Sequence, residues 1–268
     1  MPETNLALLV RATRAAGELA MAAFGAPQAV WDKSAGNPVS ASDIACDEYL
    51  KAELLGHRPD YGWLSEETAD RPDRLACERV WVVDPIDGTR DYVRGRTGWC
   101  VSVALVEAGQ PVLAALAAPA RGQLFVAAAG GGATCNGVAL RVSGLATLDG
   151  VRLPIDPPNL IAPFWPSPWP GTAVEKPNSL ALRLAHVASG EADAWLEGRT
   201  VNEWDIAAAA LLCTEAGGTV TDRAGRPLAF NQPEPVIHGL AAATPALHAE
   251  VRDRLEHALR VFAAARRR

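Results

Sequence analysis

The sequence predicts a mixed fold of helices and strands, α+β in its first half and α/β in its second. Apolar residues recur at helical spacing over Leu6–Leu19, which indicates an amphipathic helix. Two β-forming runs, 101–106 and 112–116, flank a turn that contains Gly109, as is typical of a hairpin. Helical and strand-like segments then alternate over residues 179–222.

Composition and charge restrict the class of protein. The 268 residues are 49% hydrophobic and 21% charged, which suits a globular chain with a large buried core. The net charge of −6 argues against a nucleic-acid partner but allows a small anionic substrate beside bound metal ions. Five scattered cysteines without a CxxC pair indicate reduced thiols. The start lacks a signal-peptide pattern and no apolar run has membrane-spanning length, so we expect a cytoplasmic protein with no membrane partner.

The first half is predicted to contain two helices followed by strands. Capping residues mark the helix starts, and short runs of β-branched and aromatic residues mark the strands. In chain order these are a helix from its cap Thr4 to about Phe24; a helix over 42–55, with a capping signal at Ser40 and Asp43 and a stop at Gly56; strands over 61–64, 79–84, 101–106, 112–116 and 124–128; and a tight or mobile turn at 130–132.

The second half begins with an irregular stretch that holds seven prolines, from Pro154 to Pro170. Proline lacks a backbone N–H and stops helices, so we expect a connection between two halves or a loop over a site. Trp165 and Trp169 in this stretch are expected to pack or to form a lid, with stacking on a base as the less favoured role. The remaining elements are helices over 179–189, 205–216 and 246–266 and strands over 192–196 and 219–221.

The most informative segment is 81–89, where an apolar strand ends in two aspartates. Asp84 and Asp87, the carbonyl of Ile86 and the hydroxyl of Thr89 offer the oxygen ligands that Mg²⁺ prefers. The alternative is an ordinary turn, since Asp, Pro and Gly all favour turns.

Two further acidic sites stand out. Glu66 and Glu67 follow the strand over 61–64, where a solvated turn is the ordinary interpretation. Asp205 opens a helix, and aspartate is a preferred helix cap. A capping aspartate that faces a site would satisfy both interpretations.

Taken in order, these motifs resemble those of the inositol monophosphatase superfamily of metal-dependent phosphatases. The resemblance extends from about Lys33 to Asp222, and the ordered set is more specific than any single motif. It rests on Glu66-Glu67, Asp84-Pro85-Ile86-Asp87-Gly88-Thr89, Trp204-Asp205 and Glu215-Ala216-Gly217-Gly218. It implies a layered αβαβα sandwich, with most metal ligands in an N-terminal half, 1–145, and with Asp205 and substrate contacts in a C-terminal half, 146–268.

The resemblance also implies a role for each site residue. The metal ligands, for two or three Mg²⁺ ions, are Glu66, Asp84, Asp87, Asp205 and the main-chain oxygen of Ile86. Thr89 matches the hydroxyl that orients the attacking water, Asp43 matches the acid that pairs with it, and Glu66 also acts in catalysis. Gly88 and Thr89 would hold the phosphate at the start of a helix, where backbone N–H groups are free. Lys33 matches a lysine on a loop beside the metals, with an ordinary surface lysine as the alternative.

We expect hydrolysis of a small phosphate monoester by a metal-activated water, since no obvious nucleophile lies beside the carboxylates. Arg90 follows Thr89, where bisphosphate nucleotidases of this superfamily tend to carry Lys or Arg, and its guanidinium could hold a second phosphate. The resemblance therefore favours a 3′(2′),5′-bisphosphate nucleotidase that converts adenosine 3′,5′-bisphosphate to AMP. A solvated basic turn is the alternative for this arginine. Glu197, with a one-residue gap, matches a glutamate with which inositol phosphatases contact substrate hydroxyls. An inositol-1-monophosphatase or a broad sugar-phosphate or histidinol-phosphate phosphatase therefore remains open.

Two departures from the family pattern fall where substrate recognition is expected. The segment 154–170 is shorter than usual, and Pro177–Leu180 replaces a Gly-Ser helix start. The resemblance further implies a homodimer and sensitivity to lithium. A catalytically silent dimeric scaffold is the alternative outside enzymes, and the complete acidic set argues against it.

Overall fold

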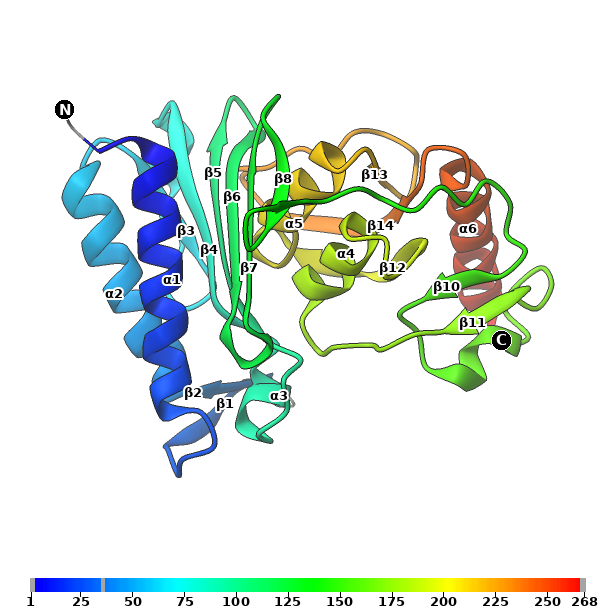
Figure 1. The fold of residues 1–268 in the computed structure, drawn as a ribbon, viewed down its shortest axis with the longest axis horizontal. Coiled ribbons are helices and arrows are strands. Elements are labelled where there is room, and N and C mark those ends of the chain that lie inside the picture. The colour runs from blue at the N-terminus through cyan, green and yellow to red at the C-terminus, as the bar shows by residue number, and fades with distance from the viewer. Residues whose placement is uncertain (1–2, 35–36, 266–268) are drawn as a thin grey trace.

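The structure is a computed structural model, and it describes residues 3–34 and 37–265. The elements form five layers, in the order helices, sheet, helices, sheet and helix (Figure 1). This arrangement confirms the αβαβα sandwich that the resemblance implied. Among the described residues, no helix combines the length and the apolar composition needed to cross a membrane.

Two helices form the first layer, α1 (Asn5–Ala23) and α2 (Ala41–His57). Both starts were predicted: Thr4 caps α1 by accepting the Ala7 N–H, and Ser40 forms a capping box with Asp43 at α2. The expected stop at Gly56 was wrong. The helix continues through Gly56 because the N–H of Arg58 still donates to the carbonyl of Leu54.

The second layer is a seven-stranded sheet in the order β3-β4-β5-β6-β7-β8-β9. β3 pairs parallel to β4, and every later neighbour pairs antiparallel. The strands are β3 (Gly62–Ser65), β4 (Arg79–Asp87), β5 (Cys100–Glu107), β6 (Gln110–Ala118), β7 (Gln123–Ala128), β8 (Gly132–Cys135) and β9 (Val138–Ala139). The predicted hairpin is confirmed as β5 and β6, whereas β8 and β9 were not predicted.

The two faces of this sheet pack against different helices. Trp81 and Val83 of β4 belong to the core under α1 and α2. Val80 and Val82 belong instead to the core that contains the helices α4 (Leu180–Ala188) and α5 (Glu203–Glu215). Because side chains alternate along a strand, Asp84 follows Val82 onto the α5 side.

The second half contributes the remaining layers (Figure 1). α4 (Leu180–Ala188) and α5 (Glu203–Glu215) lie between the two sheets, and α6 (His248–Ala265) packs on β12 and β14. The second sheet has the order β12-β14-β13 with antiparallel pairing, and comprises β12 (Ala194–Asn202), β14 (Val236–Ala243) and β13 (Thr219–Asp222). Sequence analysis located the three helices to within three residues and missed β14.

Shorter elements complete the described chain. A separate hairpin of β1 (Val30–Ser34) and β2 (Asn37–Ser40) was not predicted, nor was the parallel pair of β10 (Val151–Leu153) and β11 (Gly171–Ala173). In the proline-rich segment between β10 and β11, Trp165 and Trp169 are buried, with ring centroids 5.4 Å apart. These tryptophans are packing residues, as expected, and are not placed to stack on a ligand base. The Gly130–Gly132 turn is tight, closed by the Gly131 N–H on the carbonyl of Ala128.

Candidate metal centre

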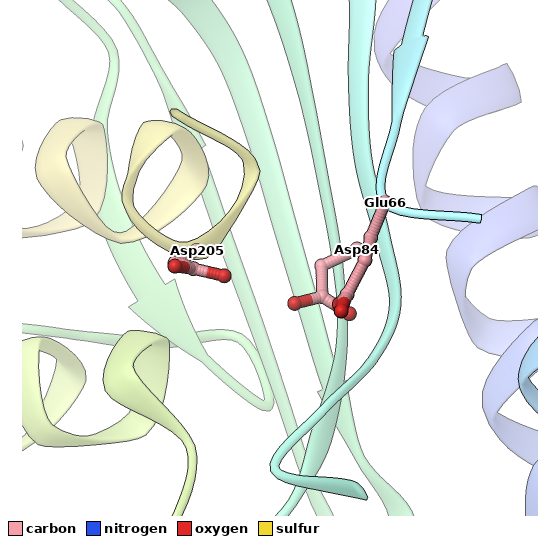
Figure 2. A group of neighbouring side chains, drawn as sticks. All are labelled: Glu66, Asp84 and Asp205. Atoms are coloured by element: carbon pink, nitrogen blue, oxygen red, sulfur yellow. The ribbon is translucent and has the colours of Figure 1, made fainter. Parts of the chain in front are cut away.

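Glu66 and Asp84 meet because β3 and β4 run parallel. Ser65 lies opposite Val83 in the register, and the N–H of Glu66 continues the ladder by donating to the carbonyl of Val83 at 3.3 Å. Both strands end at the same edge of the sheet, and Leu64, like Val82, faces the α5 side. The next residue on that face is Glu66, directly after β3, and Asp84 within β4, so the two carboxylates lie beside each other (Figure 2).

Asp205 reaches the same place from the first turn of α5 (Figure 2). The sequence suggested it as the helix cap, but Asn202 takes that position. Asp205 is the third helical residue, and its Oδ2 accepts the N–H of Asn202 at 3.0 Å in a capping box. The capping bond fixes the carboxylate while the side chain points across the site toward Asp84.

The three carboxylates form a group with the chemistry of a Mg²⁺ site. Glu66, Asp84 and Asp205 each place one oxygen within 4.8 Å of the others. Burial, and then the charges of Glu66, Asp87 and Asp205, raise the pKa of Asp84, while burial, Asp87 and Glu66 raise the pKa of Asp205. A hard cation with oxygen ligands relieves both causes at once, so these residues fit Mg²⁺.

A β-bulge shapes the segment after Asp84. Asp84 lies opposite Ser102 and Asp87 lies opposite Cys100, so β4 carries one extra residue at this point. The N–H of Ile86 turns back to Asp84 Oδ1 at 3.0 Å, and the carbonyl of Ile86 accepts the Thr89 hydroxyl at 3.0 Å. The bulge thus takes Ile86 out of regular pairing, which suits the main-chain ligand that the resemblance implied.

Asp87 has a second set of partners that was not predicted. Its Oδ2 accepts the Ser179 hydroxyl at 2.5 Å and the Ala181 N–H at 2.7 Å, and its Oδ1 accepts the Leu180 N–H at 3.2 Å. Burial raises its pKa to about 6, against the opposing effect of these bonds. Asp87 therefore ties β4 to the start of α4, and its role as a metal ligand stays a prediction.

Thr89 and Asp43 are paired as the resemblance implied. The Thr89 hydroxyl lies 3.0 Å from Asp43 Oδ1, while Asp43 Oδ2 accepts the N–H and hydroxyl of Ser40 at 2.8 and 2.5 Å. Burial raises the pKa of Asp43 although these bonds oppose the shift. The capping box of α2 therefore fixes the acid that holds the threonine.

Gly88 makes the turn between β4 and α3 (Thr89–Val93). Its φ of 96° lies in the left-handed region, and a Cβ at this position would lie 2.6 Å from the carbonyl oxygen of Gly98. Only glycine fits both constraints. The helix expected after this residue is present and spans five residues.

Comparison with known proteins decides the family. The model of the inositol monophosphatase family matches residues 1–256. The chain belongs to the inositol monophosphatase family. It is 35% identical over 237 residues to an inositol-1-monophosphatase of Mesorhizobium japonicum, covering 82% of this chain and 86% of the relative. It is 34% identical over 235 residues to the Nus factor SuhB of Xylella fastidiosa, covering 84% of each chain.

Solved structures agree with this assignment. An inositol monophosphatase of Thermotoga maritima superimposes with a TM-score of 0.80 at 28% identity, covering 94% of this chain and 96% of that one. The extragenic suppressor protein SuhB of Bartonella henselae gives a TM-score of 0.79 at 27% identity, with coverage of 93% and 97%. As a member of the family, this protein is a metal-dependent phosphatase that uses Mg²⁺ and acts on a small phosphorylated substrate.

The acidic group opens into a cavity of about 560 Å³, called here the site cavity. Its walls include Thr89, Glu197 and three residues of the proline-rich segment, Pro154, Ile155 and Asn159. Four cationic residues also line it: Arg90, Lys176, Arg183 and Arg199. Sequence analysis proposed Arg90 and Glu197 as substrate contacts, and both lie here. Lys33 lies in β1, but its side chain falls outside the described part of the chain.

Sequence analysis also missed a residue of this phosphatase that positions Glu66. Asp47, buried on α2, accepts the hydroxyls of Ser65 and Thr68 at 2.5 Å each. These bonds hold both sides of Glu66. Asp47 lies four residues after Asp43, so both aspartates occupy one face of α2, and this spacing is the signal that could have identified it.

Proposed function

We propose that this phosphatase removes one phosphate from a 3′(2′),5′-bisphosphonucleoside such as adenosine 3′,5′-bisphosphate. One observation supports this proposal. The acidic group of Glu66, Asp84 and Asp205 lines the same cavity as four cationic side chains. A metal site alone suffices for a monoester. Additional guanidinium and ammonium groups suit a second phosphate.

Mg²⁺, when held by Glu66, Asp84 and Asp205, supplies an acidified water and neutralises charge on the phosphoryl oxygens. The single hydroxyl hydrogen of Thr89 has two acceptors at 3.0 Å, Asp43 Oδ1 and the carbonyl of Ile86, and the hydroxyl oxygen keeps lone pairs with which to accept a hydrogen from a water. Among the described residues that line the cavity there is no Ser, Cys or His. The nucleophile in our proposal is therefore water, and no phosphorylated side chain forms.

A second candidate substrate is inositol 1-phosphate. The relative from Mesorhizobium japonicum carries the name inositol-1-monophosphatase. Glu197 lines the site cavity, at the place where the resemblance implied a contact to substrate hydroxyls. A broad sugar-phosphate or histidinol-phosphate phosphatase would share this contact.

Phosphate release with Mg²⁺ present separates these candidates. We expect kcat/KM for adenosine 3′,5′-bisphosphate to exceed that for inositol 1-phosphate at least about tenfold, the value of one charge-assisted bond. Equal, slow rates on both would indicate a broad phosphatase, and faster hydrolysis of inositol 1-phosphate would overturn the proposal. Asp84→Asn provides the inactive control. No release from any monoester at millimolar Mg²⁺ would indicate a silent scaffold.

We further propose, from the resemblance and composition, a cytoplasmic homodimer without a nucleic-acid partner. Light scattering on the purified protein measures the oligomeric state, and a single species at 28.2 kDa would contradict a dimer. The relative from Xylella fastidiosa carries the name Nus factor SuhB. A gel-shift assay with structured RNA therefore tests the absence of a nucleic-acid partner, and a retarded band at physiological salt would contradict it.

A further inference from the structure

Glu197 does not stand alone in the site cavity. Arg199, two residues on, donates to it three times: Nε to Oε1 at 3.0 Å, Nη2 to Oε2 at 2.8 Å and the backbone N–H to Oε1 at 3.0 Å. Both residues line the cavity. Both oxygens of the carboxylate are thus already engaged by the neighbouring arginine.

A bulge in β12 makes this contact possible. Glu197 lies opposite Leu240 and Thr200 lies opposite His238, so β12 carries one extra residue between these pairs. On the partner strand, Gly239 has a φ of 75°, and a Cβ there would lie 3.0 Å from the carbonyl oxygen of Glu197. The bulge lies directly after Glu197 and contains Arg199, which lines the cavity.

The pair keeps both of its charges. Burial acts to raise the pKa of Glu197, but the bonds from Arg199 outweigh it and the pKa is lowered. The same bonds raise the pKa of Arg199. The side chain of Glu197 is 10% exposed while that of Arg199 is 69% exposed. The arginine therefore presents its charge to whatever enters the cavity, with the glutamate behind it.

We propose that Arg199 is the contact for a second anionic group on the substrate, and that Glu197 positions Arg199 instead of accepting hydrogens from substrate hydroxyls. This inference rests on the proposed function for the choice of a phosphate as that group. Three of the five N–H hydrogens of a guanidinium remain when two are donated to Glu197, and they suit phosphate oxygens.

A second arginine of the cavity wall, Arg183, supports this assignment. It is 7% exposed, and it donates its Nε to the carbonyl of Pro177 at 2.7 Å and its Nη2 to the carbonyl of Asn178 at 3.2 Å. Both acceptors are neutral, and the charge of Arg183 interacts with the carboxylates of Asp87 and, less strongly, Glu197. Two guanidinium groups, those of Arg183 and Arg199, therefore lie near the single carboxylate of Glu197. A neutral polyol gains little there, whereas an anion is attracted.

Matched substrates with and without the second phosphate test the inference. The pairs are adenosine 3′,5′-bisphosphate with adenosine 3′-phosphate, and fructose 1,6-bisphosphate with fructose 1-phosphate. For each pair, the ratio of kcat/KM measures the preference for the second phosphate. We expect Arg199→Gln to lower the ratio about 10- to 100-fold in the pair that the wild type prefers, chiefly through a lower kcat/KM for the bisphosphate.

Two further variants separate the parts of the pair. Arg199→Lys keeps the positive charge but lacks the planar, bidentate donor geometry of a guanidinium, so it should retain part of the preference for the bisphosphate. Glu197→Gln should lower the ratio because the guanidinium loses its fixed plane, and a purely structural role would change both substrates of a pair equally. Arg226→Gln, an exposed arginine paired with Asp222 outside the site cavity, is the matched control and should leave the ratio unchanged.

Binding gives a readout that does not depend on turnover. We expect AMP, which keeps the second phosphate, to inhibit more strongly than adenosine, with the difference lost in Arg199→Gln. A wild-type ratio near one in both pairs, or a ratio that Arg199→Gln leaves intact, would overturn the inference. If only the fructose pair shows an Arg199-dependent preference, the inference stands and the nucleotidase proposal fails.

Discussion

Asp47 controls the position of Glu66 from the neighbouring helix. Its carboxylate accepts the hydroxyls on either side of Glu66, at Ser65 and Thr68. We expect Asp47→Asn to raise the Mg²⁺ concentration needed for half-maximal activity about tenfold, since charge-assisted bonds are worth about 1.5–3 kcal/mol each. Activity at saturating Mg²⁺ should recover most of its value, because no reacting group is removed.

Calorimetric titration of Mg²⁺ into the metal-free variant checks the same prediction without turnover. Glu53→Gln is the matched control, because Glu53 lies on α2 and pairs with Arg11 away from the site. Unchanged Mg²⁺ affinity in Asp47→Asn would show that the segment around Glu66 holds its shape without this contact.

For single residues, sequence reasoning identified side chains that meet in the site cavity but not the side chains that hold them in place. Asp84, Thr89 and Asp205 stand out because their chemistry is unusual at strand and helix ends. Asp47 and Ser179 do not stand out, since a single aspartate in a helix or a serine before one has many ordinary explanations. The spacing from Asp43 indicates only the helix face on which Asp47 lies. The partners of Asp47 and Ser179 lie 18 and 92 residues away in the chain, and no local pattern identifies them.

The junction between β4 and α4 depends on Asp87. Its carboxylate accepts three hydrogen bonds from the start of α4. We expect Asp87→Asn to lower the free energy of unfolding by about 1–3 kcal/mol. The NH₂ of the asparagine would face N–H and O–H donors where the carboxylate accepts hydrogen bonds. Activity should fall as well, and denaturant unfolding measured without Mg²⁺ separates this loss of stability from any loss of metal binding.

Ser179→Ala is the companion variant, since it removes one of the three bonds and leaves the carboxylate in place. A metal-free Asp87→Asn protein with wild-type stability would show that Asp87 serves the metal and not the helix. The sequence alone suggested that Asp87 serves only the metal. It shows the aspartate but not the start of α4, which donates hydrogen bonds to it.

The turn at Gly88 joins β4, the strand that carries Asp84, to the short helix α3. A Cβ at this position would lie 2.6 Å from Gly98 O and 2.9 Å from Ser179 N, at a φ of 96°. We expect Gly88→Ala to destabilise the protein by at least about 2 kcal/mol, through backbone strain and the displacement of both neighbours. Thermal denaturation measures the effect.

Gly95→Ala is the matched control for this turn. Gly95 also has a positive φ, 66°, but no atom lies within 4 Å of a Cβ built there. It should therefore show the smaller cost of the left-handed conformation alone. Equal destabilisation by the two substitutions would contradict the proposed clash.

Strand β14 shows why some elements escape sequence analysis. Its sequence contains Gly239 followed by Leu240 and three alanines, so it has few β-branched residues and no alternation of polar and apolar positions. It lies between β12 and β13, with Ala242 in one core and Ala241 in another. A strand buried on both faces lacks the alternation of polar and apolar residues, and the alanines of this one equally suit a helix.

For the whole molecule, local patterns indicated mixed α and β elements but not the order of the layers. The core under α4 and α5 includes Leu64 and Val82 from the first half and Leu240 from the second. Such contacts depend on how the two sheets enclose the helix pair, which only the family resemblance implied. The division at residue 145 thus stays a prediction, although the two halves share this one core.

Metal binding should stabilise the folded protein, and by more at higher pH. Burial raises the pKa of Asp87 to about 6, well above the value of about 3.9 for an unfolded aspartate, and the pKa of Asp84 is raised too. Without metal, the folded state therefore binds more protons than the unfolded chain, and this contribution to stability is lost as pH rises from about 4 through 6 and beyond. Mg²⁺ competes with those protons.

We expect saturating Mg²⁺ to raise the Tm by about 5–10 °C at pH 7.5, from about 2.7 kcal/mol at a hundred times Kd, and by less at pH 5.5. His186 and His248 have a pKa lowered by burial and contribute a pH dependence of opposite sign. Comparison with Asp84→Asn, which keeps both histidines, therefore isolates the carboxylates. Thermal scans with and without EDTA measure both quantities. A Mg²⁺ shift that is equal at the two pH values, or that persists in Asp84→Asn, would show that the stabilising ion binds elsewhere.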